Sequence, residues 1–149
     1  MDLWDFFLRV GAALLSGVLI GIEREIRNKN AGLKTNALVA LGAAVFVVIS
    51  FQFRNEAGVD VTRVLGQVVT GIGFIGAGVI LHKGTTVRGL TTAATIWCSA
   101  SAGCLAAMGF YKELAVLTVM IIFVNVIFGA LDDYINRKLD RDPKNKVED

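Results

Sequence analysis

Residues 66–100 have the sequence GQVVTGIGFIGAGVILHKGTTVRGLTTAATIWCSA, and this stretch decides the class of fold. Its first half belongs to a run from Val64 to Leu81 that has no charged residue and contains five glycines. Eighteen residues rise about 27 Å as a helix, which is close to the roughly 30 Å hydrocarbon core of a bilayer. A short basic turn at 82–88 leads into a second uncharged run at 89–111. The pattern predicts two transmembrane helices joined as a hairpin.

Four glycines of the first helix, Gly71, Gly73, Gly76 and Gly78, lie inside the apolar run. Three of them match the pattern G-x-G-x-x-G of dinucleotide-binding domains. That pattern is meaningful only between a strand and a helix, with an acidic residue about 20 positions on. Positions 94–100 contain no acid. Because glycine lets two helices approach closely in lipid, we expect these four residues to pack helices together.

The whole chain has the composition of a membrane protein. Its 149 residues are 54% hydrophobic with one proline, and the mean hydropathy is +0.61. These values are too apolar for an ordinary soluble domain. The uncharged runs predict an all-α membrane protein, a bundle of about five transmembrane helices within residues 1–131, followed by a charged tail. The expected spans are about 3–22, 35–53, 64–82, 89–111 and 113–131, and the tail is 132–149.

The basic residues are distributed unevenly between the two sides of this arrangement. The loop 23–34, the turn 82–89 and the tail together contain 11 Lys and Arg, whereas the connections on the other side contain 3. Cytoplasmic loops of membrane proteins carry the excess of Lys and Arg. We therefore expect the amino terminus outside and the carboxyl-terminal tail in the cytoplasm.

An internal repeat is visible at an offset of 57 residues. AGLKTNALVALGA at 31–43 aligns with RGLTTAATIWCSA at 88–100, with five identities in 13 positions. The alignment predicts a parallel two-helix repeat, although chance matches among small apolar residues are the alternative. In each copy a glycine, Gly32 or Gly89, precedes a threonine, Thr35 or Thr92, that is expected to cap the helix start.

The end of the first span carries the candidate functional charges. Glu23 is expected to turn inward and to place its carboxylate near both helix starts, with Arg24 or Arg88 donating a charge-assisted hydrogen bond. The alternative is a solvated helix end without a special role. Glu25 lies about 100° further round the helix and is expected to tolerate replacement.

The remaining polar residues do not form an enzyme site. The chain has one histidine, and Cys98 lies in an apolar span, where a packing role is expected. Asn125 and other polar residues at membrane depth are expected to form interhelical hydrogen bonds. We expect no catalytic activity, no metal, no cofactor and no nucleic-acid partner. The leading hypothesis is a membrane regulator that contacts another integral protein or a second copy of itself. The alternative is a small ion transporter or channel, for magnesium in particular.

Three stretches identify a family resemblance: GVLIGIEREIRNKNAGLKTNALVALGAAVFV, VVTGIGFIGAGVI and VRGLTTAATIWCSASAG. Together they resemble the MgtC/SapB family of bacterial membrane proteins over nearly all of residues 10–130. The family pattern ERxxR…AGL[RK]T falls on Glu23, Arg24, Arg27, Ala31, Gly32, Leu33, Lys34 and Thr35. The small-residue hairpin of the family falls on Gly71, Gly73, Gly76, Ala77 and Gly78, then on Gly89, Leu90, Thr92, Ala93 and Ala94. Its functionally implicated Trp-Cys pair falls on Trp97 and Cys98.

The resemblance implies a role in the bacterial inner membrane. It implies adaptation to low magnesium and, in pathogens, survival inside macrophages. It also implies regulation of another membrane protein, with the proton-conducting part of F-type ATP synthase as a suggested partner. Virulence-linked members carry a folded cytoplasmic domain after the last span, and this chain is expected to lack it. Functions that depend on that domain are therefore in doubt.

Overall fold

The structure is a computed structural model and describes residues 1–58 and 60–139. These residues form five α-helices and one short β-hairpin. The elements are α1 (Leu3–Ile26), α2 (Leu33–Gln52), α3 (Thr62–Val79), β1 (Leu81–Lys83), β2 (Thr86–Arg88), α4 (Leu90–Met108) and α5 (Tyr111–Leu139). All five helices are long and apolar enough to cross a membrane. The prediction of an all-α bundle of about five spans is confirmed.

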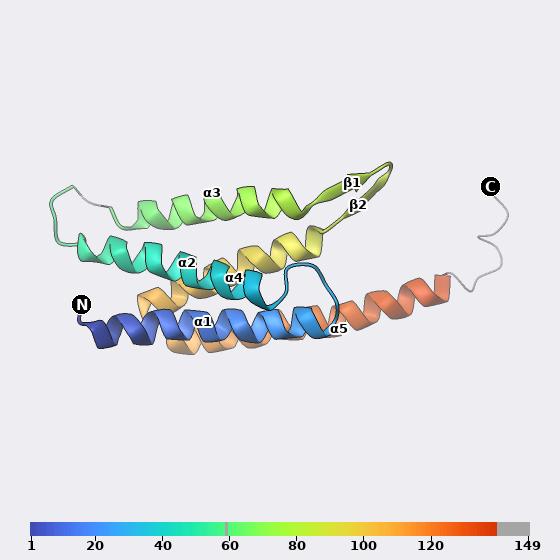
Figure 1. The fold of residues 1–149 in the computed structure, drawn as a ribbon, viewed down its shortest axis with the longest axis horizontal. Coiled ribbons are helices and arrows are strands. Elements are labelled where there is room, and N and C mark those ends of the chain that lie inside the picture. The colour runs from blue at the N-terminus through green and yellow to red at the C-terminus, as the bar shows by residue number, and fades with distance from the viewer. Residues whose placement is uncertain (59, 140–149) are drawn as a thin grey trace.

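The helices lie alongside one another, and the bundle has two distinct ends (Figure 1). The amino terminus, the α2–α3 loop and the α4–α5 turn lie at one end, which we call the amino-terminal end. The α1–α2 loop and the β-hairpin lie at the other, the hairpin end, where α5 continues past the end of α1. Helices α1, α2 and α4 form the closely packed centre, whereas α3 packs mainly on α4, and α5 on α1 and α4.

Small residues make the centre of the bundle tight. Gly17 of α1 lies so close to α2 that a Cβ built on it would be 2.6 Å from the carbonyl oxygen of Asn36. A Cβ on Gly21 would be 2.6 Å from the Cα of Leu33, and one on Gly103 of α4 would overlap the backbone of Ala40. Such distances allow dispersion contact between backbones in a medium that offers little hydrophobic driving force. The close contacts therefore lie between α1, α2 and α4.

The glycines that the sequence singled out occupy a different environment. No described residue lies within 4 Å of a Cβ built at Gly71, Gly73 or Gly78, and one at Gly76 would be 3.6 Å from the Cβ of Ala93, an ordinary contact. Within one chain the expected packing role is therefore not met at three of the four positions. The overlooked signal is Gly17-Val-Leu-Ile-Gly21, a G-x-x-x-G pair typical of close helix contacts.

The basic turn between α3 and α4 is a small antiparallel ribbon. Leu81 pairs with Arg88, His82 with Val87 and Lys83 with Thr86. The ribbon ends at Gly89, whose φ of 93° is a conformation that side-chain-bearing residues rarely adopt, and a Cβ there would overlap the carbonyl of Val79. Gly89 is therefore required both for its backbone conformation and for its close approach to α3.

The two copies of the proposed repeat have the same residue type at the helix start but differ in their buried faces. Gly32 and Gly89 are the N-cap residues of α2 and α4. Ala37 is buried, whereas its aligned partner Ala94 is exposed. The two copies therefore share the cap glycine but differ in its conformation, with φ −80° at Gly32 and 93° at Gly89, and in the faces that they bury.

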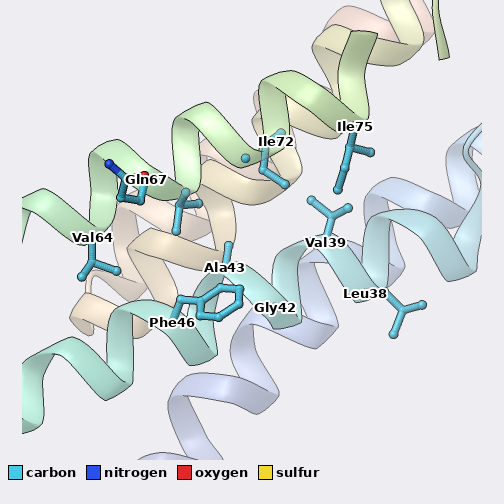
Figure 2. A pocket seen from close by; sticks show the side chains of 11 residues that line it. Leu38, Val39, Gly42, Ala43, Phe46, Val64, Gln67, Ile72 and Ile75 are labelled. Carbon is cyan, nitrogen blue, oxygen red and sulfur yellow. The ribbon is translucent and has the colours of Figure 1, made fainter. Parts of the chain in front are cut away.

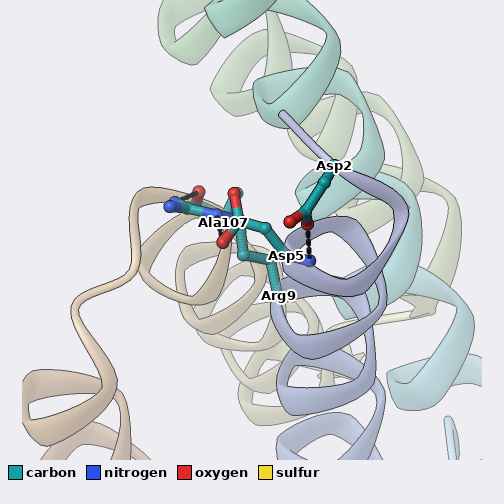
Figure 3. Close-up of polar contacts among 4 residues, drawn as sticks. All are labelled: Asp2, Asp5, Arg9 and Ala107. Carbon is teal, nitrogen blue, oxygen red and sulfur yellow. Dashed lines mark hydrogen bonds and ion pairs between the residues drawn. The ribbon is translucent and has the colours of Figure 1, made fainter.

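At the amino-terminal end, the side chain of Arg9 joins α1 to α4, two helices that are far apart in the sequence (Figure 3). Its Nε lies 2.9 Å from Oδ1 of Asp5, and the two side chains form an i, i+4 ion pair. The same side chain donates a hydrogen bond to the carbonyl of Ala107 in the last turn of α4. A cation is favoured there because the last carbonyls of a helix carry partial negative charge. Arg9 therefore caps α4 as well as pairing within α1.

At the other terminus, α5 extends the helical structure to Leu139. The first part of the predicted charged tail is therefore helical. Residues 140–149 of the tail lie outside the described residues.

Candidate functional site

One face of α4 joins three other helices by hydrogen bonds. Thr92, Thr95 and Ser99 follow the spacing i, i+3, i+7, which places them on one side of the helix, and all three are buried. The Oγ1 of Thr92 accepts from Nη2 of Arg24 on α1 at 3.0 Å. Ser99 donates to Oδ1 of Asn36 on α2 at 2.8 Å. We call this set, with the residues that join it below, the interhelical polar cluster.

The cluster reaches α5 through Asn125. Thr95 donates to its side-chain oxygen at 3.4 Å. Arg27 Nη1 donates to its backbone carbonyl at 2.6 Å. A Cβ built on Gly129, one turn further along α5, would lie 2.5 Å from the same Nη1. Gly129 therefore makes room for Arg27, and the guanidinium group connects the end of α1 to the middle of α5.

The charged residues of α1 are buried within this cluster. Glu23 is 8% exposed and Arg24 is 4% exposed, so neither is a solvated helix end. The nearest cationic contact of Glu23 is Nε of Arg27, 3.9 Å from Oε1. Among the described residues, neither Glu23 oxygen nor Arg24 Nε has a hydrogen-bond partner. Buried charges at membrane depth are costly unless they are paired, and they commonly mark functional positions.

The start of α2 is bonded by the carboxylate of Glu25, a residue that was expected to tolerate replacement. The backbone amide of Leu33 donates to Oε2 of Glu25 at 3.2 Å. Gly32 is required beside it, because a Cβ there would overlap the Glu25 carboxylate. Thr35 is half-buried, and its side chain does not cap the start of α2. Glu23 was expected to meet this helix start, and Glu25 does so instead.

The loop before α2 is also held from inside the bundle. Asn36 donates from Nδ2 to the carbonyls of Ala31 and Gly32, at 2.6 and 3.0 Å. Its Oδ1 accepts a hydrogen bond from the hydroxyl of Ser99, so the Asn36 side-chain amide connects the loop to α4. Ala31 has a φ of 55° and Asn28 a φ of 52°, which are unusual for residues other than glycine. Asn36 was missed in the sequence because a lone asparagine near a helix start has no distinctive local pattern.

Two predicted site residues lie apart from the cluster. Arg88 is exposed on β2, and the ion pairs of the described residues do not include it. Cys98 is a half-buried free thiol on α4, beside the partly exposed Trp97. Thr92 belongs to the cluster, but its hydroxyl accepts from Arg24 and does not cap α4. Among the described residues, no group of three or more His, Cys, Asp and Glu side chains could hold a metal ion.

The cluster unites four helices at the hairpin end and leaves α3 outside. Its bonds join α1 to α4, α2 to α4, α4 to α5, and α1 to α5. Nearer the amino-terminal end, a buried Ser16–Thr118 hydrogen bond of 2.7 Å again joins α1 to α5. A network of this kind can fix the relative positions of helices. It therefore joins α1, α2, α4 and α5 by polar bonds, whereas the buried side of α3 packs on α2 and α4 through apolar residues.

Comparison with known proteins identifies a family. The family model described as the MgtC family matches residues 10–134. Protein MgtC of Salmonella typhimurium (strain LT2) is 44% identical over 137 residues, covering 92% of this chain and 58% of the relative. Protein MgtC of Brucella abortus (strain 2308) is 53% identical over 121 residues, covering 81% of this chain and 50% of the relative.

A further relative comes from a cyanobacterium. An uncharacterized protein of Synechocystis sp. is 42% identical over 138 residues, covering 93% of this chain and 58% of the relative. The chain thus spans about half the length of the curated relatives it matches. No solved structure is significantly similar to the chain.

Proposed function

The chain belongs to the MgtC family, and we propose that it is a non-enzymatic regulator that binds another integral membrane protein within the bilayer. The MgtC-type relationship and the five helices of membrane-spanning length make it a multi-pass membrane protein. Supporting adaptation to low magnesium or intracellular survival is part of this proposal. The proposal also names two candidate partners. One is the F-type ATP synthase, and the other is a second copy of this chain.

The exposure of α3 is the observation that supports the proposal. Only Val68, Ile72 and Gly76 of its 18 residues are buried. Its outward side carries a row of small exposed residues at the spacing i, i+4, i+7, i+11, namely Gly66, Thr70, Gly73 and Ala77. Small residues in such a row allow a second transmembrane helix to pack closely. Because the polar cluster does not include α3, this helix can engage a partner while the four-helix body stays intact.

A magnesium transporter or channel is the alternative function. Glu23 favours it: the part of the chain that the structure describes offers its buried carboxylate no hydrogen-bond partner, and buried carboxylates in membrane spans are typical of ion pathways. Two arginines, Arg24 and Arg27, lie beside that carboxylate, however, and repel a cation. Magnesium also requires several oxygen ligands together with retained water. The arrangement therefore supports regulation better than transport.

Photo-crosslinking tests the proposed contact. A photoreactive amino acid is placed at Gly73, on the outward side of α3, and in a matched variant at Val119, a 66% exposed position on α5. Cells are irradiated, and the crosslinked proteins are identified by mass spectrometry. We expect the Gly73 variant to capture one defined membrane protein that the Val119 variant does not. Capture of lipid alone at both positions would contradict the proposal.

Magnesium flux provides the complementary measurement. The purified protein is reconstituted into liposomes that contain a magnesium-sensitive dye. The regulator proposal expects influx no faster than in protein-free liposomes. Influx that Glu23→Gln abolishes would establish the alternative.

The orientation is likewise proposed, with the hairpin end in the cytoplasm of a bacterium and the protein in the inner membrane. It rests on the excess of Lys and Arg at that end. In a background without Cys98 and Cys104, single cysteines at Asn30 and Asn55 are treated in intact cells with an impermeant thiol reagent. The cysteine at position 55 should react and that at position 30 should not. The reverse result would invert the topology.

A further inference from the structure

An apolar groove lies between α2 and α3, on the side of α3 opposite the row of small residues. Its volume is about 500 Å³. Figure 2 shows side chains of the two helices facing each other across it. Apart from Gln67, the lining consists of apolar residues and glycine: Leu38, Val39, Gly42, Ala43 and Phe46 of α2, and Val64, Val68, Gly71, Ile72 and Ile75 of α3.

The dimensions and surroundings of the groove fit a hydrocarbon chain. From Val64 to Ile75 it extends about 16 Å along α3, at 1.5 Å per residue. Half of the roughly 30 Å hydrocarbon core, the depth of one leaflet, is about 15 Å. Leu38 is 66% exposed and Phe46 62% exposed, so the groove opens sideways. Since both helices span the membrane, the medium at that opening is lipid.

The charges at the two ends of the groove differ. At the hairpin end, Lys34 lies one helical turn before Leu38, and both it and Arg88 are exposed. Arg88 pairs with Leu81, two residues beyond the end of α3, and is therefore at the base of the ribbon. The sequence contains no Asp or Glu from residue 61 to residue 112. The nearby carboxylate of Glu25 is engaged by the amide of Leu33.

The amino-terminal end of the groove has no such excess of positive charge. Arg54 of the α2–α3 connection and Arg63 in the first turn of α3 are matched by Glu56 and Asp60 of the connection, so the two signs balance. Basic residues at a membrane surface attract anionic lipid headgroups. The charge distribution therefore selects the hairpin end for a negatively charged headgroup.

We propose that the groove binds one acyl chain of an anionic phospholipid, whose negatively charged headgroup lies at the hairpin end, where Lys34 and Arg88 are exposed. The lipid fills the space between α2 and α3 and supports α3 from the side that faces the bundle. This site is distinct from the proposed partner contact, because the partner would use the opposite side of α3. The lipid site and the partner contact can therefore be refuted independently of each other.

Native mass spectrometry of the full chain tests the site. The protein is released from nanodiscs that contain equal amounts of phosphatidylglycerol and phosphatidylcholine, and the retained lipid is counted. We expect one tightly retained phosphatidylglycerol. Gly71→Leu fills the groove at a position where a Cβ meets nothing within 4 Å, so it should fold and should lower retention about tenfold. Gly73→Leu, which is equally open but outside the groove, is the matched control and should retain the lipid.

A second pair of variants tests the headgroup. Arg88→Gln should weaken phosphatidylglycerol retention about fivefold, which corresponds to about 1 kcal/mol for one basic residue at an anionic surface. Arg88→Lys should restore it. Equal retention of phosphatidylcholine would overturn the anionic assignment, and unchanged retention in Gly71→Leu would overturn the groove. A dimer without lipid would place a second copy there and would also refute the proposal.

Discussion

Comparing Gly103→Ala with Gly73→Ala isolates the energetic role of close helix contact. Both glycines lie within helices, so both variants gain the same helix propensity, about 1 kcal/mol. At Gly73 the new methyl group meets no described atom within 4 Å. At Gly103 it would overlap the backbone of Ala40, which is 0% exposed and cannot rotate away. Helices α4 and α2 must then separate, and overpacking of this kind costs about 1–3 kcal/mol. Because the propensity gain cancels, the two variants should differ in unfolding free energy by that amount.

The assay is reversible unfolding in mixed micelles. Sodium dodecyl sulfate is titrated into the purified protein, and the loss of helix is followed by far-ultraviolet circular dichroism. Gly73→Ala should match or exceed the wild type, and Gly103→Ala should unfold at a lower detergent fraction. If the two variants agree within about 0.5 kcal/mol, the contact between α2 and α4 is not the close packing described above.

Three further predictions concern the loops and helix starts. Ala31→Gly should raise the unfolding free energy by up to about 1 kcal/mol in the same assay, because it relieves a left-handed backbone; a loss of stability would show that the alanine methyl is needed. Glu25→Gln should lower it by about 0.3–1 kcal/mol through the loss of negative charge at the start of α2, and wild-type stability would contradict the helix-start assignment. Thr62 donates hydrogen bonds that hold the pKa of Asp60 below its usual value. The resulting stabilisation is present above about pH 4 and disappears as the pH falls through the lowered value. The wild type should therefore lose stability in acid more steeply than Asp60→Asn. Parallel pH profiles of the two proteins would show that the Asp60–Thr62 hydrogen bonds do not contribute to stability.

Features that depend on local composition were predictable. Five uncharged runs predicted five membrane-spanning helices, since a helix satisfies its own backbone in lipid and needs a definite apolar length. The Asp5–Arg9 ion pair is also a local feature, because residues at i and i+4 are neighbours on a helix surface. The family relationship was carried by several separated motifs in one order. The burial of Glu23 and Arg24 could be named only as one of two alternatives, because a charged residue at a span end suits both the interface and the interior.

Sequence alone therefore determined the class of protein, the number of helices and their family, because hydropathy and motif order are properties of the chain itself. Tertiary structure decided which face of each helix meets which neighbour. The close backbone contacts lie at Gly17, Gly21 and Gly103 rather than along α3. The amide at the start of α2 donates to Glu25 rather than to Glu23. A glycine favours close packing only where another backbone approaches it, and a carboxylate bonds a helix start only when its rotation about its own helix brings it there. Those conditions depend on how α1, α2 and α4 are docked, which no local pattern records.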